Sequence, residues 1–372
     1  MSLALLEIRR RKLQFALIGL IVTLITYLVL MVNGLGIGLA ELSGRALLNF
    51  NADALVYSEN ANLSVIRSEL STANVAEASK LPGVTEAAPL GYFGVNIRLP
   101  DGTVSSRAKS AALIGYDPGT LGEPKVISGA ALKPGDTGVI LADRLFLKYT
   151  GLNIGDTVTL SYRLSSGQFR IVGETDEGAF FFQPTVYVLR STWQEMKYGA
   201  TDASQPVASI VLLRGNGLAG HQANGLQSVT LRDAFRNIEG VSAQQSTVDS
   251  LMFFGYLIGA LVIGVFFYVL TLQKVAQIGV LKAIGASSGF VVRQIFGQVL
   301  ALSIGGIAIA LPLAWATNRA LQNLPAPVPI AFTTTAFVIT TALMIGTALI
   351  GALFSARQAI KVDPIIALGQ QQ

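Results

Sequence analysis

The chain of 372 residues contains no cysteine and a single histidine, His221. Disulfides, thiolate metal sites and cysteine nucleophiles are therefore excluded, and so is a multi-histidine metal cluster within one chain. Charged residues are also scarce: they make up 13% of the sequence, against roughly 25% in a soluble domain. Hydrophobic residues reach 51%, and the mean hydropathy is +0.55. This balance is typical of a protein that spans a membrane.

Acidic residues are absent from two long stretches, 15–40 and 251–362. Ion-driven transporters bind their driving ion with carboxylates or unwound polar helices inside the membrane, so the sequence does not favour that class. A GxxxxGK[ST] phosphate loop is also missing, and no nucleophile–base pair stands out. If the chain moves a solute against a gradient, a partner must supply the energy.

Four apolar segments are long enough to cross about 30 Å of hydrocarbon. They cover Phe15–Ala40, Leu251–Leu272, Ile295–Thr317 and Ile330–Phe354. Basic residues 9–12 precede the first segment, as in a signal peptide. However, the apolar part of a cleavable signal has only about 7–15 residues, so we expect an uncleaved first helix.

Lysine and arginine near the spans predict the orientation. The N-terminal tail carries four of them, the loop between the second and third spans three, and the C-terminal tail two. The loop between the third and fourth spans carries only Arg319. We therefore expect a multi-pass protein of the cell membrane with both termini cytoplasmic and the large domain outside. Because the basic residues flank spans rather than form a folded basic face, no nucleic-acid partner is expected.

Between the first two spans the composition becomes that of a soluble domain. Alternating apolar runs predict strands at Ala54–Tyr57, Val95–Leu99 and Thr157–Leu160. Segments 74–84 and 228–241 share a short helix that ends in Gly-Val, and each is expected to supply one strand–helix–strand unit. The predicted fold is an α-helical membrane protein with four transmembrane helices and a large extracytoplasmic α+β domain, a split α/β core, inserted between helices 1 and 2. The expected segments are a cytoplasmic amphipathic helix (1–12), the first span with its outer extension (13–50), the outer domain (51–249) with a β-rich insertion (about 117–205), the second span (250–273), a cytoplasmic coupling segment (274–293), the third span (294–317), a short outer loop (318–329), the fourth span (330–355) and a cytoplasmic tail (356–372).

The coupling segment has apolar residues at helical spacing, Ile278, Leu281 and Ile284, with Lys282 on another face. Such a helix can lie on the lipid surface, or it can act as a rigid lever that docks into a groove of a soluble partner. The periodicity alone leaves both interpretations open.

Two motifs resemble the FtsX/MacB-type permeases of ABC transporters. Ile278–Ser287 is similar to the signature of that family, and Ser355–Leu368 is similar to the tail that follows its last span. The order of one span, a large domain and three spans is also similar over the whole chain, and 151–160 and 170–173 look like the inserted β subdomain of the family. Gln277 departs from the pattern, since relatives usually carry glutamate there. This departure puts a salt bridge to the ATPase in doubt.

The resemblance implies a non-catalytic subunit: a homodimer of this chain in the lipid bilayer with two copies of a separate cytoplasmic ATPase, which would bind the ATP and Mg. It also implies that force from the ATPase enters through the coupling segment. The residues expected to take part are Gln277, Ile278, Leu281, Lys282, Ile284 and Gly285.

Within this family, the first span and the length are most similar to the HrtB-type haem-efflux permeases. The similarity implies that haem is the transported ligand rather than a permanent cofactor, with its site at the outer end of the dimer seam. Methionine can ligate haem iron and arginine can pair with a propionate, so the iron is expected to meet Met31 or Glu41. The candidate haem-binding residues are Met31, Asn33, Glu41, Arg45, Phe253 and Tyr256.

Simpler interpretations stay open for each of these residues. Met31 can fill a gap in the packing, Glu41 and Arg45 can form an exposed helix pair, and Phe253 and Tyr256 can belong to the interfacial aromatic belt. His221 lies in a loop rich in glycine and asparagine, where a solvated role is expected. Two other functions also remain open: export of another hydrophobic molecule or (glyco)lipid with an adaptor protein, and regulation of an outer partner without transport.

Overall fold

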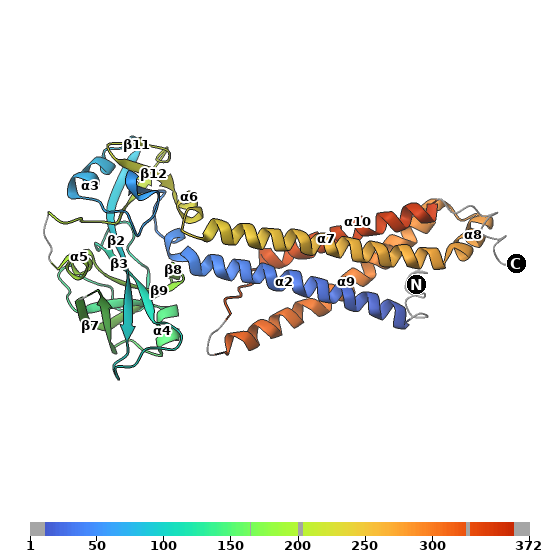
Figure 1. The fold of residues 1–372 in the computed structure, drawn as a ribbon, viewed down its shortest axis with the longest axis horizontal. Helices are drawn as coiled ribbons and strands as arrows, with labels where there is room; N and C mark the ends of the chain where they lie inside the picture. The colour runs from blue at the N-terminus through green and yellow to red at the C-terminus, as the bar shows by residue number, and fades with distance from the viewer. Residues whose placement is uncertain (1–11, 164, 200–203, 325–327, 361–372) are drawn as a thin grey trace. The chain divides into compact units, whose positions relative to one another are not determined.

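The computed structural model describes residues 12–163, 165–199, 204–324 and 328–360 (Figure 1). The chain divides into two compact units. We call residues 1–38 and 246–372 the membrane unit, and residues 39–245 the inserted domain. The amphipathic helix expected before Lys12 and the tail motif from residue 361 onward lie outside the described residues.

Among the described residues, four long helices are apolar enough to cross a membrane, as the sequence predicts. They are α2 (Lys12–Leu48), α7 (Val241–Gln273), α9 (Ser288–Gln322) and α10 (Thr334–Ile360), and a short helix, α8 (Val275–Ala283), joins α7 to α9 (Figure 1). Helix α7 begins at residue 241 rather than at the expected 250, and α9 begins at 288 rather than 294. Apolar composition marks only the part of a helix that lies in lipid, so the polar first turns escaped prediction.

Small residues bring the helices of the membrane unit close together. A Cβ atom added to Gly351 on α10 would lie 2.5 Å from the carbonyl oxygen of Ala260 on α7, and one on Gly306 of α9 would lie 2.8 Å from Val22 on α2. Close backbone approach is the main source of packing energy between helices in lipid. By contrast, a Cβ on Gly346 would meet no described atom within 4 Å. Some glycines of the spans, such as Gly351 and Gly306, therefore lie at close helix contacts, whereas Gly346 does not.

In its described residues, the inserted domain is built on a 12-stranded sheet with five short α-helical or 3-10 segments around it. Its first strand, β1 (Ala54–Ser58), pairs with β10 (Ile210–Gly215) on one side and β12 (Leu226–Thr230) on the other. The remaining elements are η1 (Glu59–Ala61), α3 (Thr72–Ser79), β2 (Val84–Arg98), β3 (Ser110–Tyr116), β4 (Val126–Gly129), β5 (Val139–Asp143), α4 (Arg144–Thr150), β6 (Thr157–Tyr162), β7 (Ser165–Thr175), β8 (Ala179–Phe180), β9 (Gln183–Leu189), α5 (Arg190–Tyr198), β11 (Gln222–Ala223) and α6 (Leu231–Arg236).

Strand β2 belongs to two structures at once. Its first half pairs with β10, whereas its second half pairs with β3 and β6. The strands β2, β3, β9, β5, β7 and β6 pair in that order, and β6 returns to β2, so these six strands close into a barrel. Phe146, Trp193, Leu160 and Ile171 are among the buried residues of its core. The β-rich part therefore includes the second half of β2 and all of β3, which the expected insertion at 117–205 left out.

The predicted repeat is correct in its two short helices and their turns, but not in the strand expected after the second turn. Helices α3 and α6 are each followed by a glycine with a left-handed φ of +84°, Gly83 and Gly240. Glycine adopts this conformation without steric cost. After Gly83 the chain enters β2, but after Gly240 it enters α7. The second strand–helix–strand unit is therefore wrong, because the chain at this point continues as the helix that leads to the second span.

Candidate functional site

The coupling segment forms a short helix that is set off from the span before it. Helix α7 ends at Gln273, and Lys274 has a non-helical ψ of 5° before α8 begins. The helix resumes at once, since the backbone N–H of Ile278 donates to the carbonyl oxygen of Lys274 over 2.8 Å. The break turns the chain without a flexible linker, so α8 is a rigid continuation of α7.

Helix α8 ends in a Schellman motif. The N–H of Gly285 donates to the carbonyl oxygen of Lys282 over 3.0 Å, and the N–H of Ala286 donates to that of Leu281 over 2.9 Å. This motif requires a left-handed residue, and Gly285 has a φ of +101°. The Ser287 side chain then caps α9 by accepting from the N–H of Phe290. Gly285, predicted as a coupling residue, thus has a structural task at the helix end.

Two contacts attach α8 to the spans. Ile278 is 6% exposed and packs in a core with Phe15 of α2 and Val291 of α9. Lys282 Nζ donates to the carbonyl oxygen of Ile360, at the end of α10, over 2.8 Å. Two of the predicted coupling residues therefore join α8 to the chain's own bundle.

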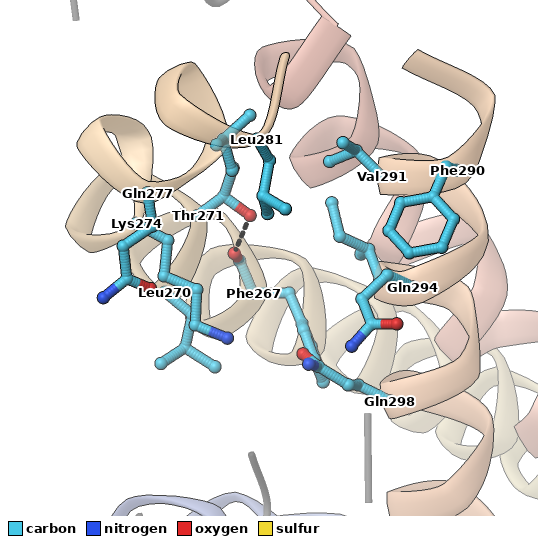
Figure 2. Close-up of a pocket in the computed structure, with 12 residues that line it drawn as sticks. Phe267, Leu270, Thr271, Lys274, Gln277, Leu281, Phe290, Val291, Gln294 and Gln298 are labelled. Carbon is cyan, nitrogen blue, oxygen red and sulfur yellow. Dashed lines mark hydrogen bonds between the residues drawn. The ribbon is translucent and has the colours of Figure 1, made fainter. Parts of the chain in front are cut away.

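Next to α8 lies a small pocket between α7 and α9 (Figure 2). It holds about 50 Å³ of space for solvent, enough for one or two water molecules. Gln294 and Gln298, one turn apart on α9, reach into this space toward α7 (Figure 2). The Gln294 Nε2 atom is buried and has no hydrogen-bond partner among the described residues. A buried amide without a partner is costly, so the pocket suits a bound water.

The pocket and its surroundings contain functional candidates that the sequence interpretation missed. Thr271 on α7 and Ser355 on α10 are buried and share a hydrogen bond between their hydroxyls. The sequence does contain a signal for this contact: both residues are polar and lie at the end of an apolar span, and such side chains commonly form hydrogen bonds between helices in lipid. Leu281 and Gln277 also line the pocket.

Ile284 is the exposed member of the predicted apolar face. It follows α8 directly and is 77% exposed, whereas Ile278 is buried and Leu281 is half-buried. Gln277 is exposed as well. Of these three apolar residues, only Ile284 is exposed in the single chain and can therefore contact a partner protein.

Four predicted haem residues belong to the membrane unit. Met31 is half-buried in a cluster with Tyr27 and Phe332. Asn33 Nδ2 donates to Thr340 Oγ1 on α10 over 2.8 Å. Tyr256 packs against a core of α2, α9 and α10, while Phe253 is 63% exposed. The structure thus gives Asn33 a role in holding α2 to α10.

The other two candidates, Glu41 and Arg45, lie in the inserted domain. Glu41 is exposed. The Arg45 guanidinium pairs with Asp176 over 3.7 Å, so it has a carboxylate partner within the domain rather than with Glu41. His221 bonds within its own loop, to the carbonyl oxygen of Gly217 over 2.9 Å, which agrees with a loop role.

The sequence is similar to known permeases. Residues 250–364 match the FtsX-like permease C-terminal family, a segment that includes α8 and the three spans around it. The chain is 26% identical over 373 residues, 99% of both proteins, to a protein of Staphylococcus haemolyticus (strain JCSC1435) provisionally named hemin transport system permease protein HrtB.

Two further similarities concern MacB. The macrolide export ATP-binding/permease protein MacB of Azoarcus sp. (strain BH72) is 26% identical over 214 residues, which are 54% of this chain and 31% of that protein. The periplasmic region of MacB from Actinobacillus actinomycetemcomitans has a TM-score of 0.34 and 16% identity, covering 51% of this chain and 94% of that one. The sequence matches bear out the resemblance in the motifs: the chain is similar to FtsX/MacB-type permeases of ABC transporters, and over nearly its whole length to the relatives named HrtB.

Proposed function

We propose that the chain is the permease of a haem-efflux pump and that a separate cytoplasmic ATPase drives it through α8. The arrangement that carries the proposal is a rigid helix that ends at a strongly exposed apolar side chain, Ile284 (77% exposed), with the less exposed Val280 (43%) one turn before it. Ile278 and Lys282 fix α8 to the bundle, and Ile284 stands exposed at its end. An apolar anchor on a short rigid helix suits a hydrophobic groove of a soluble partner.

The attachments of α8 give the force a path into the membrane unit. A push on Ile284 reaches α7 through the short break at Lys274 and α10 through the Lys282–Ile360 bond. Because the chain contains no phosphate loop and the stretches 15–40 and 251–362 contain no carboxylates, we place the entry of energy at this end. Two ATPase copies that bind ATP and Mg would close on two copies of this segment.

A stripe on α7 supports a homodimer. Seven large apolar side chains recur at spacings that alternate between three and four residues, and each is 39–60% exposed; Phe253, Leu257 and Val269, outside this series, are exposed as well. A 3.5-residue repeat keeps one seam facing a partner helix, whereas lipid requires only that a surface be apolar. We assign the seam to a second copy of the chain; its residues are Leu251, Phe254, Ile258, Leu261, Val265, Tyr268 and Leu272.

The orientation in this proposal follows the basic residues. Lys274, Lys282, Arg293 and Arg357 all lie near α8 or the end of α10, and such residues favour the cytoplasmic side. The inserted domain then faces outward.

Haem is the proposed substrate because the full-length relatives carry names that assign them to hemin transport. Met31 supplies a thioether among aromatic rings, and Phe253 and Tyr256 offer ring surfaces on α7. A planar apolar ligand that enters from the outer leaflet suits such residues. Asn33, Glu41 and Arg45 remain predicted contacts.

The test uses the permease with its ATPase in proteoliposomes, with haemin as the ligand. Wild type is expected to shift the Soret band of haemin and to export haemin only when ATP is hydrolysed. Met31→Leu keeps the volume of the side chain but removes the sulfur, so the Soret shift should be lost if the thioether ligates iron.

An unshifted Soret band in wild type would reject haem. ATP-driven export of a lipid, or a need for an adaptor protein, would then favour the other hydrophobic substrates. ATP-driven motion without any export would favour regulation of an outer partner.

A further inference from the structure

A hairpin turn of the inserted domain grips the outer end of α2 through its backbone. Helix α2 leaves helical geometry at Gly44, with φ −172° and ψ 33°, and then continues to Leu48. Just before this break, the carbonyl oxygens of Leu42 and Ser43 accept hydrogen bonds from the N–H groups of Phe182 and Phe181, over 2.8 and 2.9 Å. The two donors are consecutive residues of one turn, so the turn holds the helix at two adjacent points.

This turn has an unusual composition. Phe180 pairs with Gln183 across β8 and β9, which leaves Phe181 and Phe182 as the two central residues. Their φ values are +49° and +60°. Turns with two left-handed central residues normally use Asn-Gly, because a bulky side chain is strained there. A strained conformation persists only where the surroundings enforce it, and such sites commonly have a function.

The surroundings of the turn enforce its conformation. The Phe181 ring contacts those of Phe180 and Tyr92, with centroids 4.6 and 5.2 Å away. On the other side, Ala46 and Leu47 of α2 are fully buried in the same core. Phe182, by contrast, is 44% exposed, so its ring contributes little to the core, and its contact with α2 is the backbone bond to Leu42.

The connection before the turn grips the same helix with side chains. Arg45 pairs with Asp176 over 3.7 Å, and Asn49 Nδ2 donates to the carbonyl oxygen of Glu177 over 3.0 Å. Buried Asp143 then fixes the connection to the barrel, since its Oδ2 accepts from the N–H of Gly178 over 2.8 Å. We call residues 176–182 the clasp. It links barrel strands β7 and β9.

We propose that the clasp is the permanent joint through which α2 moves the barrel. This inference rests on the proposed function, because it needs a span that is driven by ATP. Two backbone bonds and an ion pair hold residues 42–45 of α2, and an amide bond holds Asn49, just after the helix ends. Together they oppose both sliding and rotation of this end of α2. Displacement of α2 is therefore passed to β7 and β9 instead of being absorbed in a loop.

The test compares two changes at one position. Phe182→Pro removes the N–H that bonds to Leu42 and forbids a positive φ, whereas Phe182→Gly removes the same ring but keeps the N–H and accepts the φ. A spin label on Ser128→Cys, an exposed position on β4 beside β7, reports motion of the barrel, and the chain has no other cysteine. The permease–ATPase complex is measured with and without ATP.

In wild type and Phe182→Gly, the label spectrum should change with ATP. In Phe182→Pro the complex should still hydrolyse ATP, while the spectral change falls to a small fraction of that in wild type. Arg45→Ala with Asn49→Ala removes only side-chain contacts and should reduce the change in part, which keeps the proposal testable if the proline variant misfolds.

A disulfide between cysteines at positions 42 and 182, formed before labelling, should leave the ATP-dependent change intact because the joint stays closed. Loss of the change in the disulfide form would overturn the proposal, as would an equal response in wild type, Phe182→Pro and the double alanine variant. If ATP does not change the label spectrum in wild type, both the proposed function and the joint are overturned. If ATP fails to change the spectrum only in the disulfide form, the joint alone is overturned and the proposed function is not.

Discussion

Lys282 Nζ donates a hydrogen bond to the carbonyl oxygen of Ile360 over 2.8 Å. The bond joins the segment between the second and third spans to the end of the fourth. Together with the burial of Ile278, it makes α8 part of the bundle rather than a helix that rests loosely beside it. A load on the exposed Ile284 is therefore transmitted to several spans at once.

The first prediction concerns Ile284. We expect Ile284→Glu to leave the permease folded, because the side chain is 77% exposed and an exposed change affects stability by about 0.5 kcal/mol or less. Export per ATP hydrolysed should fall at least about tenfold, since a charge left unpaired in an apolar groove costs more than about 1.4 kcal/mol. Proteoliposome export and phosphate release measure this ratio.

Ile284→Leu is the matched control and should retain coupling, because it keeps the apolar volume. Full coupling in the glutamate variant would show that α8 does not dock through this residue. If α8 merely lies on lipid, the ATPase should not protect Ile284→Cys from thiol labelling, and the glutamate variant should show no coupling defect.

The second prediction compares two glycines of α10. A leucine at position 351 would collide with the backbone of Ala260 and Gly264, whereas a leucine at position 346 would enter open space among the described residues. Overpacking of a tight contact costs about 1–3 kcal/mol. We expect Gly351→Leu to lower the melting temperature and the monodisperse yield in detergent, and Gly346→Leu to behave like wild type. Equal effects would mean that α7 and α10 do not cross at Gly351.

The sequence predicts those parts of the structure that the lipid environment determines, but not those that depend on tertiary contacts. Lipid requires long apolar helices, so the four spans follow from composition. The polar start of α7 does not, because residues 241–249 gain no hydropathy signal from being helical. Periodicity grouped Ile278 with Ile284, yet only the tertiary fold decides that Phe15 covers the first and leaves the second exposed.

Long-range pairs were equally out of reach. The sequence offers Arg45 a nearby partner in Glu41 but does not reveal Asp176, with which it pairs, because Asp176 lies in a distant part of the chain; a contact with haem stays a prediction. The clasp could not be anticipated either, since Phe-Phe contradicts the usual composition of its turn. Such local conflicts with propensity are common at functional or strained sites, and they become visible only with the backbone angles.

The third prediction is a pH dependence set by Asp143. Its side chain accepts from the N–H groups of Leu145 and Gly178, and burial raises the pKa of this carboxyl above its ordinary value. The folded protein therefore holds the proton more tightly than the unfolded chain does. The stabilisation is fully present below a pH of about 3.9, the ordinary value, and is lost as the pH rises through the raised pKa.

Asp143→Asn cannot titrate and keeps only one acceptor for two N–H groups, so it should be less stable than wild type. The difference in unfolding midpoint between the two proteins should be largest in acid and should narrow toward neutral pH. Fluorescence of Trp193, buried in the same domain, can follow the unfolding. A difference that stays constant across the pH range would exclude Asp143 as the titrating group.

The last prediction tests the seam on α7. Val265 lies on the heptad stripe and Phe266, the next residue, lies off it, although both are exposed in the single chain. In a symmetric pair of helices the seam residues of the two copies face one another, whereas adjacent residues point about 100° away.

Because the natural chain has no cysteine, each variant introduces a single thiol. Oxidation in membranes should link Val265→Cys into dimers and leave Phe266→Cys mostly monomeric. Lipid around both positions would instead give the two variants the same low yield, and the stripe would then be a lipid-facing surface.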